Sequence, residues 1–382
     1  MMIALVHHYH AVSPKYTKRE ICMLLRKDHG VDITERQLKY VCQKEGLSKH
    51  WNIDSNLIKE MVSNELDTSR RNVGYRQMSE IVNLRYGTRI SKESVRKALK
   101  EVDPDGVEER RGRVLKRKIY ETNGPNDVYH IDGNDKLKQW GFYIHSGVDG
   151  FSRKVLWMKV SSTNSDPIVI ANYFLDCVKK NGFAPRQIRM DFGTENIYCE
   201  DLQVFFTNDA DSFRYGRSTA NQRIEAYWSR LKKFRLCWWI QYFTDMFQLG
   251  LYKPYLSTHK EALLFCFMPA IQRELNEFMA TWNARRVRQS ASAPGGKANI
   301  LFSMPRAFGF EDQGIQVNPN DIRVAEDALG IKQHPVWIDK DIYELITCYL
   351  HIHNLDVPID AEGACNLYVK ILSLFENDNF TV

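Results

Sequence analysis

The chain has 382 residues, of which 43% are hydrophobic and 26% are charged. Both fractions are ordinary for a globular protein, and the length is sufficient for two or three domains with at least one sizeable core. No apolar run approaches the roughly 20 residues of a transmembrane helix, and the N-terminal segment MMIALVHHYH lacks the basic region of a signal peptide. We therefore expect neither a membrane span nor secretion.

The eight cysteines are scattered along the chain and include no Cys-x2-Cys pair. This spacing favours reduced thiols over a disulfide framework or a zinc ribbon. Reduced thiols are typical of the cytosol and the nucleus.

The net charge of +6 is unevenly distributed. Residues 1–126 hold 25 Lys and Arg against 17 Asp and Glu, residues 127–319 hold 24 against 19, and residues 320–382 hold 4 against 11. Basic N-terminal and middle regions suit a polyanionic partner. Ordinary solvated surface charge would give the same asymmetry.

Residues 1–107 read as two copies of one helical unit, at about residues 15–46 and 74–102. In the first copy, a helix stops at Gly30 and a second helix starts after Thr34, where Gln37 completes a capping box. Two helices joined by a short turn that contains glycine have the shape of a helix-turn-helix.

The second copy repeats this order. A helix ends near Gly87, and another helix starts after Ser91, which is a good N-cap residue. A polar stretch near Trp51–Arg71 joins the two copies.

The second helix of each copy would enter the major groove of DNA with its early exposed residues over the base edges. The candidate contacts are Arg36, Gln37 and Lys39 in the first copy and Lys92, Glu93 and Arg96 in the second. Helix-turn-helix shapes also occur as plain packing units, which is the alternative.

Residues 108–119 form a linker that is dense in arginine and lysine. Its cations would follow a phosphate backbone, although a solvated connector has the same composition. The residues that we expect to contact DNA are Arg111, Arg113, Lys116 and Arg117.

From Val128 onwards the hydrophobic period changes to that of an α/β domain, which we place at residues 120–310. Three extended runs come first, around a DGFS hairpin turn with its glycine in the usual place, and helices and strands then alternate. The order β-β-β-α-β-α-β-α predicts a ribonuclease H-like fold. A mostly helical segment completes this domain, and residues 311–382 form an acidic helical C-terminal region.

Three acidic residues occupy distinct elements of this order. Asp132 follows the first apolar run, Asp191 follows a later one, and Glu225 lies in the first turns of a helix. The first pair is separated by 58 residues and the second by 33. A single acid of this kind would be read as a solvated surface carboxylate. Acids at the ends of buried strands are unusual unless a metal or another partner satisfies them.

Phosphodiester cleavage and transfer need an activated oxygen nucleophile and stabilisation of the leaving oxygen. Two divalent ions about 3.5–4 Å apart supply both. Mg²⁺ prefers hard oxygen ligands, so Asp132, Asp191 and Glu225 are candidate ligands for two Mg²⁺ or Mn²⁺ ions.

Neighbouring residues suggest a supported site. We expect Gly193 to let the backbone turn beside Asp191, Asn196 to hydrogen-bond near the metal, and Asn221 and Gln222 to face DNA or a metal-bound water. The helix that carries Glu225 is basic, as a DNA-gripping helix would be, although a solvated face is the alternative reading. Its cations are Arg223, Arg230, Lys232 and Lys233.

Several blocks resemble the integrase core domain of retroviral integrases and related D,D,E transposases, and most closely its eukaryotic family. They include GPNDVYHIDGNDKLKQWGFYIHSGVDGFSRKVLW, IRMDFGTEN, YGRSTANQRIEAYWSRLK and WNARRVRQS. The resemblance implies that Asp132, Asp191 and Glu225 form the catalytic triad and that the protein binds double-stranded DNA in the nucleus. It also implies that copies of the chain form a homo-oligomer. The zinc module with His-x3-His and Cys-x2-Cys that precedes such cores is absent.

Two functions remain open at this stage. The first is an enzyme of DNA integration that cleaves DNA and transfers strands with Mg²⁺. The second is a domesticated DNA-binding regulator or scaffold that keeps the fold without catalysis. A nuclease for RNA–DNA hybrids on the same fold is less favoured, because helix-turn-helix units suit duplex DNA.

Overall fold

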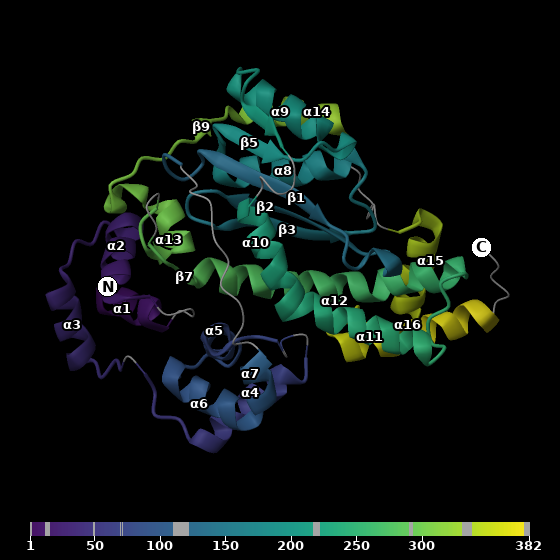
Figure 1. The fold of residues 1–382 in the computed structure, drawn as a ribbon, viewed down its shortest axis with the longest axis horizontal. Coiled ribbons are helices and arrows are strands. Elements are labelled where there is room, and N and C mark those ends of the chain that lie inside the picture. The colour runs from purple at the N-terminus through teal and green to yellow at the C-terminus, as the bar shows by residue number, and fades with distance from the viewer. Residues whose placement is uncertain are drawn as a thin grey trace. The chain divides into compact units, whose positions relative to one another are not determined.

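The computed structural model describes residues 2–11, 16–48, 50–68, 70, 72–109, 122–216, 222–289, 293–330 and 338–377. The chain divides into two compact units, Met1–Arg117 and Lys118–Val382 (Figure 1).

The first unit is helical. Its helices are α1 (Met2–Ala11), α2 (Lys18–His29), α3 (Glu35–Lys44), α4 (Ser55–Leu66), α5 (Tyr75–Arg85), α6 (Lys92–Val102) and α7 (Pro104–Glu109). The predicted helix ends are confirmed: Gly30 ends α2 in the left-handed conformation, and Thr34 and Gln37 form a capping box at α3. Ser91 caps α6 through the backbone N–H of Ser94.

The prediction of two helices in each repeat was incomplete, because the structure has three. The stretch expected to be a polar connection contains α4, which Asp54 caps and which buries Ile58, Val62 and Leu66. These apolar residues recur every four positions, so they form one stripe that the polar residues between them obscured. The helix α1 was missed because its apolar residues show little helical period. It buries Val6 and Tyr9 in a cluster with residues of α2 and α3.

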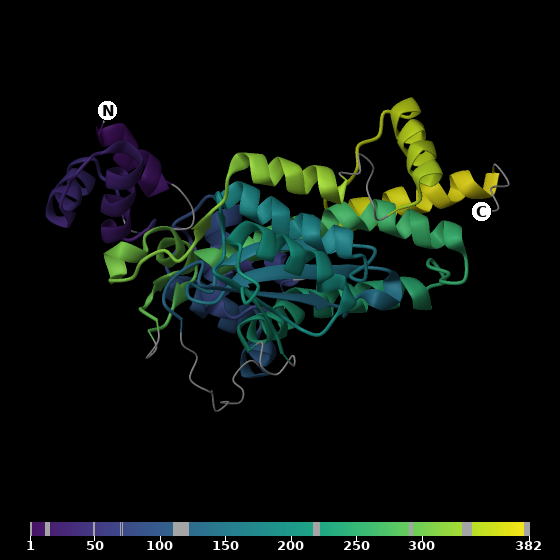
Figure 2. The same cartoon turned by 90° about the horizontal axis from the view of Figure 1, so that it is seen from above.

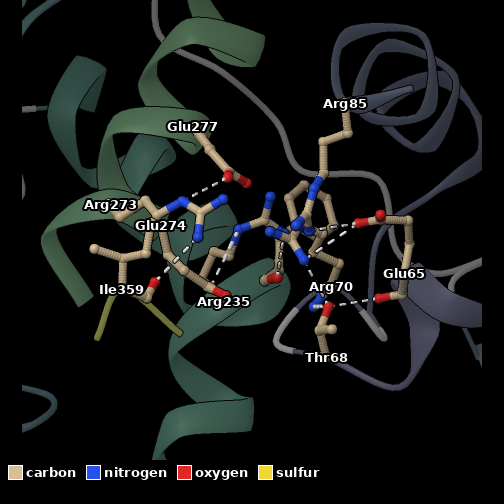
Figure 3. A network of polar contacts seen from close by, with 10 residues as sticks. Glu65, Thr68, Arg70, Arg85, Arg235, Arg273, Glu274, Glu277 and Ile359 are labelled. Atoms are coloured by element: carbon tan, nitrogen blue, oxygen red, sulfur yellow. Dashed lines mark hydrogen bonds and ion pairs between the residues drawn. The ribbon is translucent and has the colours of Figure 1, made fainter. Parts of the chain in front are cut away.

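The first unit also contains a buried ion pair. Glu65 and Arg70 are 2% and 3% exposed, and a carboxylate oxygen of Glu65 lies 3.2 Å from Nη1 of Arg70. Arg85 approaches the same oxygen at 3.4 Å, and the hydroxyl of Thr68 accepts a hydrogen bond from Arg70 (Figure 3). Two guanidinium groups therefore share one carboxylate.

The second unit is built on a five-stranded sheet in the order β3-β2-β1-β5-β6. The first three strands pair antiparallel, whereas β1–β5 and β5–β6 pair parallel. This is the predicted ribonuclease H-like arrangement. The strands are β1 (Val128–Asn134), β2 (Tyr143–Asp149), β3 (Val155–Ser161), β5 (Gln187–Met190) and β6 (Phe213–Tyr215).

Helices cover both faces of this sheet (Figures 1 and 2). On one face, Tyr129 and Ile131 pack into a cluster with α8 (Pro167–Asn181), α9 (Ile197–Thr207) and α14 (Pro319–Leu329). On the other face, Ile144 and Met158 pack with α10 (Gln222–Leu231) and α12 (Ser257–Ala284). This alternation along the strands is the period of two expected for a sheet that is buried on both sides.

The helix predicted around Glu225 is interrupted. After α10, residues Lys232–Leu236 form a π-helical turn, η4, and α11 (Cys237–Gln248) follows. The turn contains the fully buried Arg235, whose Nε lies 3.9 Å from Glu274 of α12 (Figure 3). A π turn brings residues five apart onto the same side of a helix, so Leu231 and Leu236 both point into the core.

The C-terminal region from residue 311 shares the core of the second unit. The two-residue strands β4 (Phe183–Ala184) and β9 (Ile315–Gln316) pair antiparallel, and α14 packs on α8. The helices α15 (Lys340–Ile352) and α16 (Ala361–Asn377) belong to the same apolar cluster as α12. The remaining short elements are β7 (Arg286–Val287), β8 (Gly296–Lys297) and α13 (Ala298–Ser303).

The hairpin turn between β2 and β3 differs from the prediction in its glycine. Arg153, and not Gly150, adopts the left-handed conformation, with φ of 61°. Asp149 holds the turn, since its carboxylate accepts hydrogen bonds from the backbone N–H and the hydroxyl of Ser152. The aspartate at this turn is therefore structural.

Candidate active site

Asp132 lies on the central strand β1, on the face that α10 covers. The alternation of the strand sends Tyr129 and Ile131 toward α8 and α9 and leaves Asp132 on the opposite face. The indole N–H of Trp228, on α10, donates a hydrogen bond of 2.8 Å to Oδ2 of Asp132. The carboxylate is therefore held from the helix that also carries Glu225.

Asp191 follows the last residue of the neighbouring parallel strand β5. Tyr129 pairs with Ile188 and His130 with Arg189, and this register, extended by two residues, sets Asp132 opposite Asp191. Neighbouring strands lie about 4.8 Å apart. The side-chain amide of Asn196 donates to Oδ1 of Asp191 at 3.2 Å, so this carboxylate also has a neighbour that orients it.

Glu225 lies in the first turn of α10, and its side chain is exposed. Its carboxylate acts on Asp132 through space. The pKa of Asp132 is raised to about 7, first by burial and also by the charges of Asp191 and Glu225, against the lowering effect of the hydrogen bond from Trp228. The three acids thus share one electrostatic field.

A divalent cation suits this field. Two neighbouring anions and burial both disfavour ionisation of Asp132, and a cation would reverse that penalty. The donors are carboxylate oxygens, the ligands that Mg²⁺ and Mn²⁺ prefer. Among the residues that the structure describes, no group of three His, Cys, Asp or Glu side chains is already arranged to hold a metal ion. The three acids therefore fit a divalent cation through their oxygen donors and their negative charge, without a preformed arrangement of ligands.

Gly193 has a different role from the one expected. Its φ of −112° is open to any residue, so the backbone makes no turn there that requires glycine. A Cβ atom at this position would, however, lie 2.1 Å from a carboxylate oxygen of Glu195. Only the end of the flexible Glu195 side chain occupies that space, so glycine leaves room for Glu195 but is not required by the backbone.

The basic residues predicted on the helix of Glu225 are distributed between surface and core. Arg230, Lys232 and Lys233 are exposed, and Arg223 is half-buried. Asn221 and the side chain of Gln222 lie outside the described part of the chain. The four linker cations, Arg111, Arg113, Lys116 and Arg117, also lie outside it.

The candidate DNA contacts of the first unit are all on helix surfaces. Arg36 and Lys39 are exposed on α3. Lys92 lies 3.1 Å from Glu80, and Arg96 makes two hydrogen bonds to Glu93 within α6. Exposed ion pairs of this kind contribute little to stability, so these cations can exchange partners at small cost.

Sequence reasoning missed two aromatic residues beside the acids. Trp228 is buried in the apolar cluster, and its indole N–H also donates a hydrogen bond to Asp132. Phe192, directly after Asp191, is 77% exposed and stacks on Tyr215 with ring centroids 5.4 Å apart. Both residues lie close in sequence to a predicted acid, and this proximity could have identified them, because an aromatic ring beside a catalytic centre can contact a nucleobase.

The sheet order and the placement of the acids define an α/β protein of the ribonuclease H-like class. Residues 119–296 match the family described as the integrase core domain. This match covers just under half of the chain, so an integrase core domain of the retroviral integrase and ribonuclease H-like superfamily is assigned to residues 119–296, as the sequence blocks had indicated.

The other comparisons add little to this assignment. No curated protein matches the chain. Within the described residues, no helix is long and apolar enough to cross a membrane.

Proposed function

We propose that the protein is a D,D,E integrase or transposase-like enzyme that cleaves DNA strands and transfers them to new positions. The observation that carries the proposal is the placement of Asp132 on the central strand, opposite Asp191 in the register of β5 and hydrogen-bonded to the helix that carries Glu225. Acidic residues from separate strands and helices that raise one another's pKa on a face of a sheet covered by a helix are typical of a functional site. For the integrase core family the corresponding reaction is DNA integration.

Asp132, Asp191 and Glu225 would hold the divalent ions, Mg²⁺ or Mn²⁺, and two are expected. When bound, such ions activate an oxygen nucleophile and stabilise the leaving oxygen. The protein contributes orientation. Trp228 donates to one oxygen of Asp132 and Asn196 donates to one oxygen of Asp191, so each carboxylate is oriented by a neighbouring side chain.

DNA binding would involve both units. The exposed cations Arg230, Lys232 and Lys233 near Glu225 suit a phosphate backbone, and Arg36 and Lys39 on α3 are placed as a recognition helix would place them. Double-stranded DNA as the partner implies a nuclear location, and joining DNA ends suits a homo-oligomer that holds two ends together.

The test is a strand-cleavage and strand-transfer assay with Asp191→Asn, in Mg²⁺ and in Mn²⁺. The substitution keeps the shape of the side chain and its hydrogen bond from Asn196, so the fold should persist while activity is lost. Asp176→Asn, on the exposed face of α8, is the matched control and should remain active. Full activity of Asp191→Asn in either metal would overturn the assignment.

A catalytically inactive DNA-binding regulator or scaffold is the second candidate. It is favoured by the lack, within the described residues, of a group of three ligands already arranged for a metal. For this function, the wild-type chain would bind duplex DNA with a steep salt dependence and show no turnover in Mn²⁺. Turnover that Asp191→Asn removes would exclude it.

A further inference from the structure

An apolar groove lies on the face of the sheet opposite to the one that α10 covers. The helices α9 and α14 both pack against α8, and the groove lies between them beside the start of α8 (Figure 1). Its volume is about 360 Å³. Tyr198 and Phe205 of α9, Val324 and Leu329 of α14 and Ile168 of α8 line it. The groove therefore belongs to the second unit alone.

The side chains that line the groove leave much apolar surface open to solvent. Val324 is 56% exposed, Phe205 is 48% exposed and Tyr198 is 41% exposed. Single exposed apolar residues are ordinary on a protein surface, whereas a contiguous apolar patch marks a place where another molecule binds. These three side chains share one concave surface, so they form a patch of the second kind.

The helices that form the groove are acidic. Asp201 is exposed and is the one charged residue among the lining residues that the structure describes. The sequence of α9 contains two acids and no cation, and that of α14 contains three acids and one arginine. One of these acids, Glu326, pairs with Lys179 at 2.5 Å, which leaves the two helices with an excess of negative charge. Because such a surface repels a phosphate backbone, the groove suits a partner other than DNA.

The dimensions of the groove fit one face of a short helix. Tyr198 and Phe205 are seven residues apart on α9, which is about 10.5 Å along the helix axis. Two turns of a partner helix cover this length and present apolar side chains at i, i+3, i+4 and i+7. A lysine or arginine at the edge of that face would pair with Asp201, and further cations would face the acidic helices.

A small-molecule ligand fits the lining less well. Sites for such ligands combine an apolar wall with several convergent polar groups that fix the orientation of the ligand. Among the lining residues that the structure describes, only the carboxylate of Asp201 and the hydroxyl of Tyr198 are polar side-chain groups. The chemistry of the groove therefore favours an apolar surface with cations at its edge.

We propose that the groove between α9 and α14 is a docking site for a short amphipathic helix of another protein, with bulky apolar residues on one face and lysine or arginine at its edges. This proposal does not rest on the proposed function. Because the groove and Asp132 lie on opposite faces of the sheet, a partner bound there would leave the three acids accessible.

The first test measures binding of a fluorescent helical peptide of about 15 residues to the full chain by anisotropy. The peptide carries leucines at i, i+3, i+4 and i+7, lysines at the edges of that face, and alanines elsewhere. One matched peptide replaces the leucines with alanine, and another replaces the lysines with glutamate. The lysine peptide should bind, and each matched peptide should bind at least about 10-fold more weakly. Equal binding of the lysine and glutamate peptides, or no binding of the lysine peptide, would overturn the proposal.

Variants of the protein locate the bound peptide. Val324→Arg places a cation on the apolar wall and should weaken binding of the lysine peptide at least about 10-fold, whereas Val369→Arg, at an exposed valine of α16, should bind as wild type does. Asp201→Lys should reverse the preference, so that the glutamate peptide binds better than the lysine peptide, which loss of folding cannot produce. Asp176→Lys, at an exposed acid of α8, should keep the original preference. If Val324→Arg matches Val369→Arg, or Asp201→Lys keeps the original preference, the peptide does not bind in the groove.

Sedimentation velocity of the full chain without peptide tests a second copy of the chain as the occupant. The wild type and Val324→Arg should have the same oligomeric state. An oligomer that Val324→Arg dissociates and Val369→Arg preserves would assign the groove to another copy and overturn the proposal. Binding of duplex DNA should be unchanged in Val324→Arg, so a failure of the proposed function and a failure of this docking site are measured separately.

Discussion

Trp228 and Asp132 are joined by a hydrogen bond of 2.8 Å from the indole N–H to Oδ2 of the carboxylate. The bond is made to the charged form of the acid, so it lowers the pKa of Asp132 against the upward effects of burial and of the neighbouring acids. It thereby keeps more of Asp132 ionised near neutral pH, when a metal ion has to bind.

Trp228→Phe should therefore move the acid limb of the pH–activity profile to higher pH. The aromatic bulk stays, and the lost bond to a charged group is sufficient for a shift of about one pH unit. Activity should fall several-fold at pH 7 and recover at about pH 8.5. Trp238→Phe, a half-buried ring that stacks on Tyr242, is the control. An unshifted profile would show that Trp228 does not position Asp132.

Asp132→Asn should separate stability from activity. The folded-state pKa of Asp132 is raised from 3.8 to about 7, so the folded protein binds a proton more readily than the unfolded chain. The ionised acid destabilises the fold increasingly as pH rises from about 4 to 7, and by a constant amount above that. Because the side chain is partly exposed, we expect the variant to gain only on the order of 2 kcal/mol at pH 8.

The measurement is urea denaturation of wild type and Asp132→Asn at pH 4 and pH 8, together with strand-cleavage assays. The variant should be more stable at pH 8, equally stable at pH 4, and inactive. A loss of stability at pH 8 would mark Asp132 as a structural acid. Replacing a functional acid commonly raises stability instead, because the protein retains the charge for chemistry although it destabilises the fold.

Asn196 orients Asp191 through its side-chain amide. Asn196→Ala removes this bond and should lower kcat/KM about 10- to 100-fold, the range typical of residues that hold a metal ligand. Asn196→Asp should be worse, since it places a second negative charge beside Asp191. The matched control is Asn181→Ala, a half-buried asparagine at the end of α8, which should lose stability without a specific loss of activity. Equal effects of Asn196→Ala and Asn181→Ala on kcat/KM would contradict a positioning role.

The sequence predicted the fold well where local signals and period agreed. The stop at Gly30 and the caps at Thr34 and Ser91 all appear in the structure, because each depends on a few neighbouring residues. The helix α4 was missed because its apolar stripe of one residue in four was diluted by polar neighbours. The role of Trp228 could not be predicted, because its partner is 96 residues away and only the register of α10 on β1 brings them together.

Asp149 gives a second pH dependence, of structural origin. It is fully buried, and burial raises its pKa to about 6 although three hydrogen bonds, from Ser152 and Asn126, favour the charged form. Because its folded-state pKa is raised, the contribution of Asp149 to the free energy of unfolding is largest below about pH 4. This contribution is lost as the pH rises toward 6. The single group accounts for at most about 3 kcal/mol.

Comparison with Asp149→Asn isolates this contribution, since the variant has no titrating group at the turn. The unfolding free energy of the wild type relative to the variant should fall between pH 4 and pH 6 and stay constant from pH 7 to pH 8. A parallel pH dependence of the two proteins would show that Asp149 titrates in the fold as it does in the unfolded chain.

Glu65 is the residue on which the first unit should depend most. Its carboxylate is the partner of the buried Arg70 and of Arg85, and Glu65→Gln would leave both cations without it. Removing one member of a buried ion pair typically costs about 3–5 kcal/mol. Hydrogen exchange of the full chain should therefore show faster exchange across α4–α6, with the second unit unaffected. Glu93→Gln breaks the exposed pair with Arg96 and should cost less than about 1 kcal/mol. If the two variants exchange alike, the burial of Glu65 does not determine the stability of the unit.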